Sequence, residues 1–206
     1  MKPRGAVFTT AMIAICWLIF LVDLLTSRSS NGRGEIWNSL ALDPQAVLNG
    51  QWWRLFTYGF VHDGFGHILV NSIALFQAGD FVEYVYGTRR YAAIYVAALF
   101  GGGFAAYLAT VGTGSWTVGA SGAIMGVFGA MAVLGYKLPP LRRELLRSAV
   151  VPIVLVLLYG LFMKNISNAA HIGGLIAGSI AALVIKPAQA NEMIRLFGGS
   201  NPRPPA

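Results

Sequence analysis

Six long apolar segments limit the fold of this chain more than any other feature. Several of them, at roughly 16 to 21 residues, have the length needed to cross the hydrocarbon core of a bilayer. Only 11% of the 206 residues are charged and 56% are hydrophobic, whereas about a quarter of the residues in a soluble domain are charged. The predicted spans are 6–26, 64–81, 91–111, 119–136, 149–163 and 169–185.

We therefore predict an all-α polytopic membrane protein whose six spans form one bundle. Residues 1–186 are predicted to be a single membrane domain. Residues 187–206, which contain Gly198-Gly199 and several prolines, are predicted to be a weakly ordered cytoplasmic tail.

The basic residues predict the orientation of these spans. Eleven of the fifteen lysines and arginines fall on the side of the two termini. By the positive-inside rule both termini are cytoplasmic, and the second, fourth and sixth spans run from outside to inside. We expect the membrane to be a plasma (inner) membrane. The net charge of +7 is then explained by cytoplasmic loops, so we expect the lipid bilayer, and no nucleic acid, as a partner.

The connection between the first two spans, residues 27–63, is long and rich in aromatic residues, among them Trp37, Trp52 and Trp53. Tryptophan and tyrosine favour the level of the lipid headgroups. We expect this outer loop to lie half-buried in the outer leaflet.

Four polar side chains from three distant spans are predicted to meet at one depth. Ser121 lies in the motif Gly119-Ala120-Ser121-Gly122 at the start of the fourth span, His67 and Asn71 begin the second span, and His171 begins the sixth. All would lie one or two helical turns below the outer surface. Histidine inside a span is costly and indicates a functional site.

These residues are typical of acyl-transfer chemistry. A serine hydroxyl becomes a nucleophile when a neutral histidine accepts its proton. The fourth and sixth spans contain no carboxylate, so a Ser121–His171 dyad is the simpler hypothesis, and Asp63 or Asp23 at the outer face leaves a triad open. His67 and Asn71, spaced i, i+4 on one helix face, and the Ser121 backbone amide could stabilise an oxyanion. We expect no metal or other cofactor.

Glycines are placed so that the fourth and sixth spans can approach closely. Gly119, Gly122, Gly126 and Gly129 recur at three and four residues. Gly174 and Gly178 form a GxxxG motif in the sixth span. Small residues at this spacing favour backbone contact between membrane helices, which would bring Ser121 beside His171.

These motifs together resemble the rhomboid intramembrane serine proteases over about residues 36–186. The matching elements, in order along the chain, are Trp53-Arg54, His62-x4-His67-x3-Asn71, Glu83, Gly119-Ala120-Ser121-Gly122, and Ala170-His171-Ile172-Gly173-Gly174 followed by Gly178.

The resemblance implies a compact six-span bacterial-type core in which Ser121 is the nucleophile and His171 the general base. It assigns the oxyanion hole to His67, Asn71 and the Ser121 amide, and structural support to Trp53, Arg54 and Glu83. Met125 stands where many members carry an aromatic residue that supports the catalytic imidazole, although a thioether can also contact such a ring. The role of His62 is left open.

Membrane proteins, typically with a single span, are the substrates that the resemblance implies. Cleavage would occur in or just outside the membrane, and span five with the loop 164–168 would move to admit the substrate. Two other hypotheses are an inactive rhomboid-like protein that binds spans without cutting them, and a transporter or proton relay. The complete serine–histidine pair disfavours the first alternative, and the nearly charge-free middles of the spans disfavour the second.

Overall fold

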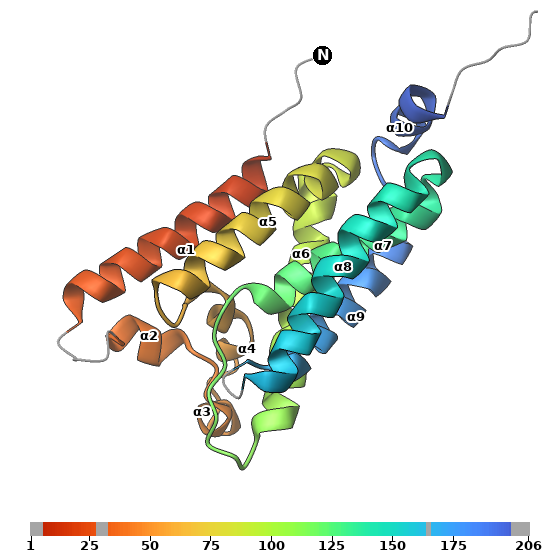
Figure 1. Ribbon diagram of the computed structural model, residues 1–206. Helices are drawn as coiled ribbons and strands as arrows, with labels where there is room; N and C mark the ends of the chain where they lie inside the picture. Colours follow the sequence, from red (N-terminus) through yellow and green to blue (C-terminus); the bar gives the residue numbers. More distant parts are fainter. Residues whose placement is uncertain (1–5, 28–32, 164–165, 199–206) are drawn as a thin grey trace, which may run out of the picture.

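The computed structural model describes residues 6–27, 33–163 and 166–198, and these residues are mostly helical (Figure 1). The helices are α1 (Val7–Thr26), α2 (Glu35–Leu40), α3 (Pro44–Leu48), α4 (Arg54–Thr57), η1 (Tyr58–Phe60), α5 (Phe65–Tyr86), α6 (Thr88–Thr110), α7 (Ser121–Lys137), η2 (Pro139–Leu141), α8 (Arg142–Phe162), α9 (Asn168–Val184) and α10 (Ala190–Phe197).

Helices α1, α5, α6, α7, α8 and α9 occupy the six predicted apolar segments, but two of them are longer than predicted. Helix α5 continues to Tyr86 and ends at Gly87, whose φ of +80° suits a glycine at a helix end. Helix α8 already begins at Arg142, directly after the turn that starts at Pro139. Charged residues lie within both extensions, Glu83 in α5 and three arginines with Glu144 in α8, so hydropathy alone underestimates the length of each helix.

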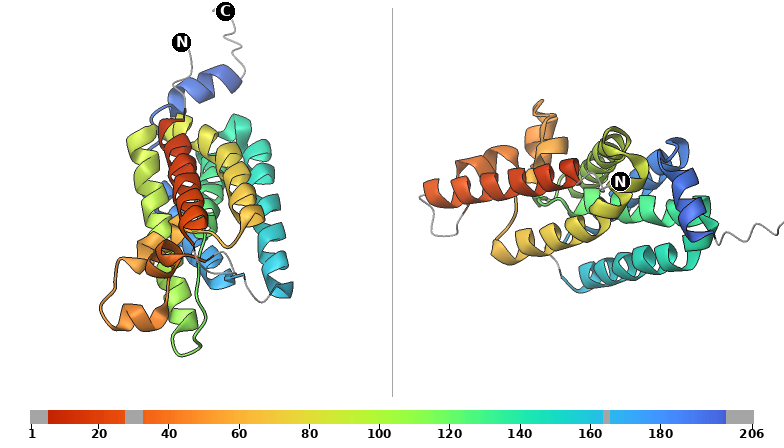
Figure 2. Two further views of the ribbon diagram at one scale, coloured as in Figure 1. Left: turned by 90° about the vertical axis from the view of Figure 1, so that its left-hand side faces the viewer. Right: turned by 90° about the horizontal axis from the view of Figure 1, so that it is seen from above.

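Four of these helical segments are long and apolar enough to cross a membrane: α1, α5, α6 and the continuous segment from Pro139 to Phe162. Helices α7 and α9 are apolar but shorter, at 17 residues each. Helix α7 occupies the centre of the bundle, since nearly all of its residues are buried and it contacts α5, α6, α8 and α9. The short helices α2 to α4 lie at the opposite end of the bundle from α10 (Figures 1 and 2).

Glycines allow α7 and α9 to touch backbone to backbone, which is the contact that their spacing predicts. A Cβ atom on Gly174 would overlap the carbonyl oxygen of Gly122, and one on Gly178 would overlap the backbone of Gly126. This contact fixes the separation of the two helices at the end where Ser121 lies.

A second glycine contact, between α6 and α9, was not predicted from the sequence. A Cβ atom on Gly173 would lie 3.2 Å from the carbonyl carbon of Gly101 and overlap the side chain of Ala105. Helix α9 is therefore held between α6 and α7, both at backbone distance.

Arg54 holds together residues 38–54 of the connection between α1 and α5. Its Nη1 donates to the carbonyl oxygens of Asn38 and Ala41 at 2.8 and 2.5 Å, and its Nε donates to Gln51 Oε1 at 2.6 Å. These bonds join α2 to α4, and the arginine is buried. The neighbouring Trp53 differs, because its side chain is 52% exposed.

Glu83 joins α5 to the start of α1. Its two carboxylate oxygens accept the backbone N–H groups of Phe8 and Thr9, each at 2.9 Å, and Oε1 also accepts the Thr88 hydroxyl at 2.9 Å. The first N–H groups of a helix lack intrahelical acceptors and attract negative charge. The buried carboxylate thus caps α1 from the neighbouring helix.

Replacing Glu83 with alanine is expected to lower the stability of the protein by about 1–3 kcal/mol, because buried N–H groups would lose their acceptor. Thermal unfolding in detergent micelles measures this effect. Glu144→Ala is the matched control, since Glu144 is an exposed carboxylate in the first turn of α8. Equal melting temperatures for the two variants would contradict the capping role.

Within the segment predicted to be a weakly ordered tail, residues 190–197 form α10. Met193 is buried against the main core, and the Gln189 N–H donates to the carbonyl oxygen of Val85 at 3.0 Å. The glycines and prolines of the segment are concentrated after α10, so the preceding residues are free to form an amphipathic turn that packs on η2. Residues 199–206 lie outside the described part of the chain.

Candidate active site

Ser121 is the first residue of α7, and Gly119 sets the conformation of the loop that precedes it. Gly119 has φ of +109°, and its N–H donates to the carbonyl oxygen of Tyr58 at 2.9 Å. A Cβ atom at Gly119 would lie 2.7 Å from the ring of His67. Glycine is required here both for its backbone conformation and for the close approach of the imidazole.

His171 lies in the first turn of α9 and faces Ser121. Its Nε2 is 2.9 Å from Ser121 Oγ, which is hydrogen-bond distance. Ser167 caps the helix by accepting the Ala170 N–H at 3.2 Å, so the turn that carries the imidazole is anchored. The structure therefore brings together the two residues that the sequence predicts as nucleophile and base.

The second ring nitrogen of His171, Nδ1, differs from Nε2 in its surroundings. Among the described residues, Nδ1 of His171 is buried without a hydrogen-bond partner. The two carboxylates considered for a triad are engaged elsewhere: Asp63 pairs with Arg33 at 3.0 Å, and Asp23 accepts backbone N–H groups at the start of α2. In the described ranges, no group of three His, Cys, Asp or Glu residues could hold a metal ion.

His67 and Asn71 contribute hydrogen-bond donors beside the same loop. The Asp63 N–H donates to His67 Nδ1 at 3.3 Å, so Nδ1 is an acceptor and the proton of a neutral ring resides on Nε2. A Cβ atom at Gly119 would lie 2.7 Å from that Nε2 and 3.8 Å from the Asn71 amide nitrogen. One hydrogen of the Asn71 amide is used by the His67 carbonyl at 3.0 Å, and the second is available.

His62 also lies against the loop that precedes Ser121. Its Nε2 accepts the Ala120 N–H at 3.5 Å, and its ring meets that of His67 edge-on with centroids 5.1 Å apart. Burial, and secondarily His67, lower the pKa of His62 to about 3. The ring is therefore neutral near pH 7 and able to act as an acceptor, in a supporting position that the sequence did not reveal.

Tyr58 is the residue near the site that sequence reasoning missed. Its hydroxyl donates to the carbonyl oxygen of Leu99 at 3.0 Å, and its own carbonyl accepts the Gly119 N–H. It is fully buried between the loop and α6, although in the sequence it is one of many aromatic residues in the outer loop. Met125 is also buried, in the main core one turn after Ser121.

Comparison with known proteins identifies the family to which this chain belongs. The family model described as the Rhomboid domain matches residues 49–188. The chain belongs to the rhomboid family. The resemblance drawn from the motifs is thereby confirmed, and the apolar helices of this rhomboid are those of an integral membrane protein.

Three relatives illustrate the similarity. Rhomboid protease GluP of Bacillus subtilis is 32% identical over 86% of this chain and 34% of its own length. RHOMBOID-like protein 5 of Arabidopsis thaliana is 33% identical over 70% of this chain and 48% of its own. Rhomboid protease AarA of Providencia stuartii is 33% identical over 68% of this chain and 58% of its own. This rhomboid thus spans between about a third and three fifths of these relatives, two of which are named proteases.

Proposed function

We propose that this rhomboid is an intramembrane serine endopeptidase that hydrolyses peptide bonds in or near the spans of membrane-protein substrates. The observation that carries the proposal is the 2.9 Å separation of Ser121 Oγ and His171 Nε2 from two helices held at backbone distance. A serine hydroxyl bonded to a buried imidazole, away from bulk water, has the arrangement of an activated nucleophile.

In the proposed reaction, Ser121 Oγ attacks the scissile carbonyl carbon while His171 Nε2 accepts the hydroxyl proton. The tetrahedral intermediate collapses when the imidazolium returns this proton to the leaving amine, and an acyl-enzyme remains on Ser121. Water then attacks the ester with His171 again acting as the base, and the acid product leaves as the serine recovers its proton.

The developing oxyanion would be stabilised by three donors: the Nε2–H of His67, the free amide hydrogen of Asn71 and the backbone N–H of Ser121. The last of these lies in the first turn of α7, where N–H groups lack intrahelical acceptors. Donors held in place before the reaction, in a site with little water, give the largest stabilisation of such charge.

The proposed topology has six spans in a plasma (inner) membrane, with cytoplasmic termini and an active site that opens toward the outer face. At 1.5 Å per residue, the 17-residue helices α7 and α9 are about 26 Å long, against about 33 Å for α5. A site at the start of the shorter helices would thus be recessed below the outer surface. The exposed Trp52 and Trp53, at 60% and 52%, suit an outer loop that is half-buried in lipid.

Substrates are proposed to be single-span proteins that enter beside α8. This helix is the least buried of the candidate spans, with 11% of its apolar window inside the protein, so it is the span that can move at least cost. The loop 164–168 that was predicted to move with it includes residues 164 and 165, which lie outside the described residues.

Cleavage of a model single-span substrate in proteoliposomes tests the proposal. Wild-type protein is expected to release a fragment of defined size, and Ser121→Ala is expected to release none above background. Substrate that binds both forms without being cut by either would instead identify an inactive rhomboid-like binding protein.

A further prediction separates a dyad from a triad. Asp63→Asn is expected to change the rate of cleavage by less than about threefold, because the exposed Asp63–Arg33 pair contributes little energy. The substitution also keeps the Asp63 backbone N–H that supports His67. Arg33→Gln, which breaks the same pair from the other side, is the control. If the cleavage rate fell by several orders of magnitude in Asp63→Asn alone, the result would support a triad that includes Asp63.

A further inference from the structure

Gln77 is a polar side chain in an unusual position on α5. It is the thirteenth residue of this 22-residue helix, which places it about 18 Å from the Phe65 end and about 14 Å from the other end. Its side chain is exposed, and it forms no hydrogen bond with any described residue. In a spanning helix this position is close to the bilayer midplane, where an amide without a partner is costly.

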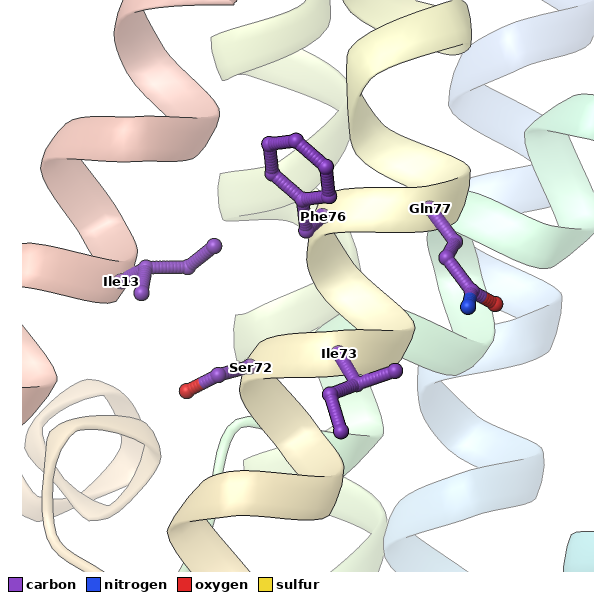
Figure 3. Close-up of a pocket in the computed structure, with 5 residues that line it drawn as sticks. All are labelled: Ile13, Ser72, Ile73, Phe76 and Gln77. Carbon is purple, nitrogen blue, oxygen red and sulfur yellow. The ribbon is translucent and has the colours of Figure 1, made fainter.

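The surface around Gln77 is apolar and shallow. A groove of about 280 Å³ between α1 and α5 is lined by Ile13, Ser72, Ile73, Phe76 and Gln77 (Figure 3). Ser72 points toward α1, where its hydroxyl accepts the Trp17 indole N–H at 3.0 Å and donates to the carbonyl oxygen of Ile68 at 2.7 Å. Gln77 points away from α1 and keeps both its donors and its acceptor free.

Helix α5 connects Gln77 to the candidate active site. His67 and Asn71 stand on the same helix, and Gln77 follows His67 by ten residues, or about 15 Å along the axis. Helix α5 packs against α1, α6 and α7, whereas among the described helices it has no substantial contact with α8. A polypeptide that reaches Ser121 beside α5 from within the membrane would pass over Gln77.

We infer that Gln77 is a specificity-determining residue that pairs with a hydrogen-bonding side chain in the span of the substrate. This inference rests on the proposed function. An amide can donate and accept at once, so asparagine, glutamine, serine or threonine would each satisfy it. Hydrogen bonds between helices in a membrane add both affinity and register.

The geometry also predicts where the polar residue of the substrate lies. For a substrate that enters with its amino terminus outside, the 15 Å between His67 and Gln77 corresponds to about ten residues of helix. It corresponds to about five residues if the segment is fully extended. The preferred position is therefore about five to ten residues after the cleaved bond.

A scan of a single asparagine through an otherwise Leu/Ala model span tests this inference. Cleavage is measured in proteoliposomes, and binding is measured by energy transfer to labelled Ser121→Ala protein. One position in the predicted window is expected to raise both kcat/KM and affinity about 3- to 10-fold over the span without asparagine. In Gln77→Leu, the spans with and without asparagine are expected to have about the same kcat/KM and the same affinity.

A second variant moves the glutamine along α5 and so tests the predicted position of the contact. In the double variant Gln77→Leu/Ile73→Gln, the glutamine lies one turn, or about 6 Å, nearer His67. The best asparagine position is expected to shift toward the cleaved bond by about four residues in a helical substrate and by about two in an extended one. Val96→Leu, a change at another exposed apolar position on α6, is the control and is expected to keep the wild-type preference.

The outcomes distinguish this inference from the proposed function. A wild-type protein without asparagine preference, or a Gln77→Leu variant that retains it, overturns the inference. Loss of self-association in Gln77→Leu with an unchanged substrate preference also overturns it, and assigns the amide to a second copy of the chain. Asparagine-dependent binding without any cleavage would uphold the inference while the protease proposal fails.

Discussion

Replacing His171 with alanine is expected to lower the rate at which a fluorophosphonate probe labels Ser121 by at least about 1000-fold. The probe reacts with a serine whose proton is removed as the bond forms, and His171 Nε2 is the base within 2.9 Å of Ser121 Oγ. Removing one member of such a pair costs about as much as removing both. Intact-protein mass spectrometry of the labelled species measures the effect.

Two controls make this result specific to the site. Ser148→Ala removes an exposed serine on α8 and is expected to label like the wild type, whereas Ser121→Ala is expected not to label. Thermal unfolding of His171→Ala shows whether the bundle is intact. Wild-type labelling in a folded His171→Ala variant would exclude this histidine as the base.

Gly174→Ala is expected to lower cleavage by about 100-fold and to destabilise the bundle by about 1–3 kcal/mol. The added methyl group would overlap the carbonyl oxygen of Gly122, so α7 and α9 must move apart. Overpacking of this kind costs energy of that order, and a misplacement of about 1 Å between reacting groups costs about 100-fold in rate. Substrate cleavage and thermal unfolding, measured on the same preparation, report the two effects.

Gly66→Ala is the matched control for this substitution. Gly66 also lies in a long helix near the site, but a Cβ atom there would have no neighbour within 4 Å. Alanine is the better helix former, so this variant is expected to be at least as stable as the wild type. If both variants behave alike, the close contact of α7 and α9 does not control the geometry of the site.

The residues that could be predicted from the sequence are those whose chemistry is unusual for their surroundings. Ser121, His67, Asn71 and His171 are polar groups within apolar segments, and the predicted directions of their spans led us to expect them at one depth. The glycine spacing in α7 and α9 likewise carries a specific physical meaning, because few other residues permit backbone contact.

The features that were missed depend on contacts between segments that no local pattern encodes. Tyr58 is indistinguishable in the sequence from other aromatic residues of the outer loop, and only the fold places its carbonyl against Gly119. The α6–α9 contact depends on the rotation of both helices about their axes. Helix α10 is short, and its order depends on packing of Met193 rather than on its own propensity.

Among the described residues, Nδ1 of His171 has no hydrogen-bond partner, and this affects the charge of the site during the proposed reaction. When a proton moves from Ser121 to His171, a negative oxygen and a positive ring form together, so a site without a carboxylate has zero net charge before and after this step. A buried carboxylate would add a permanent negative charge where there is little water, and the solvation cost of an isolated ion there is large. In the proposed reaction, a site of two residues would therefore stay electrically neutral at every stage, whereas a site with a third, carboxylate residue would not.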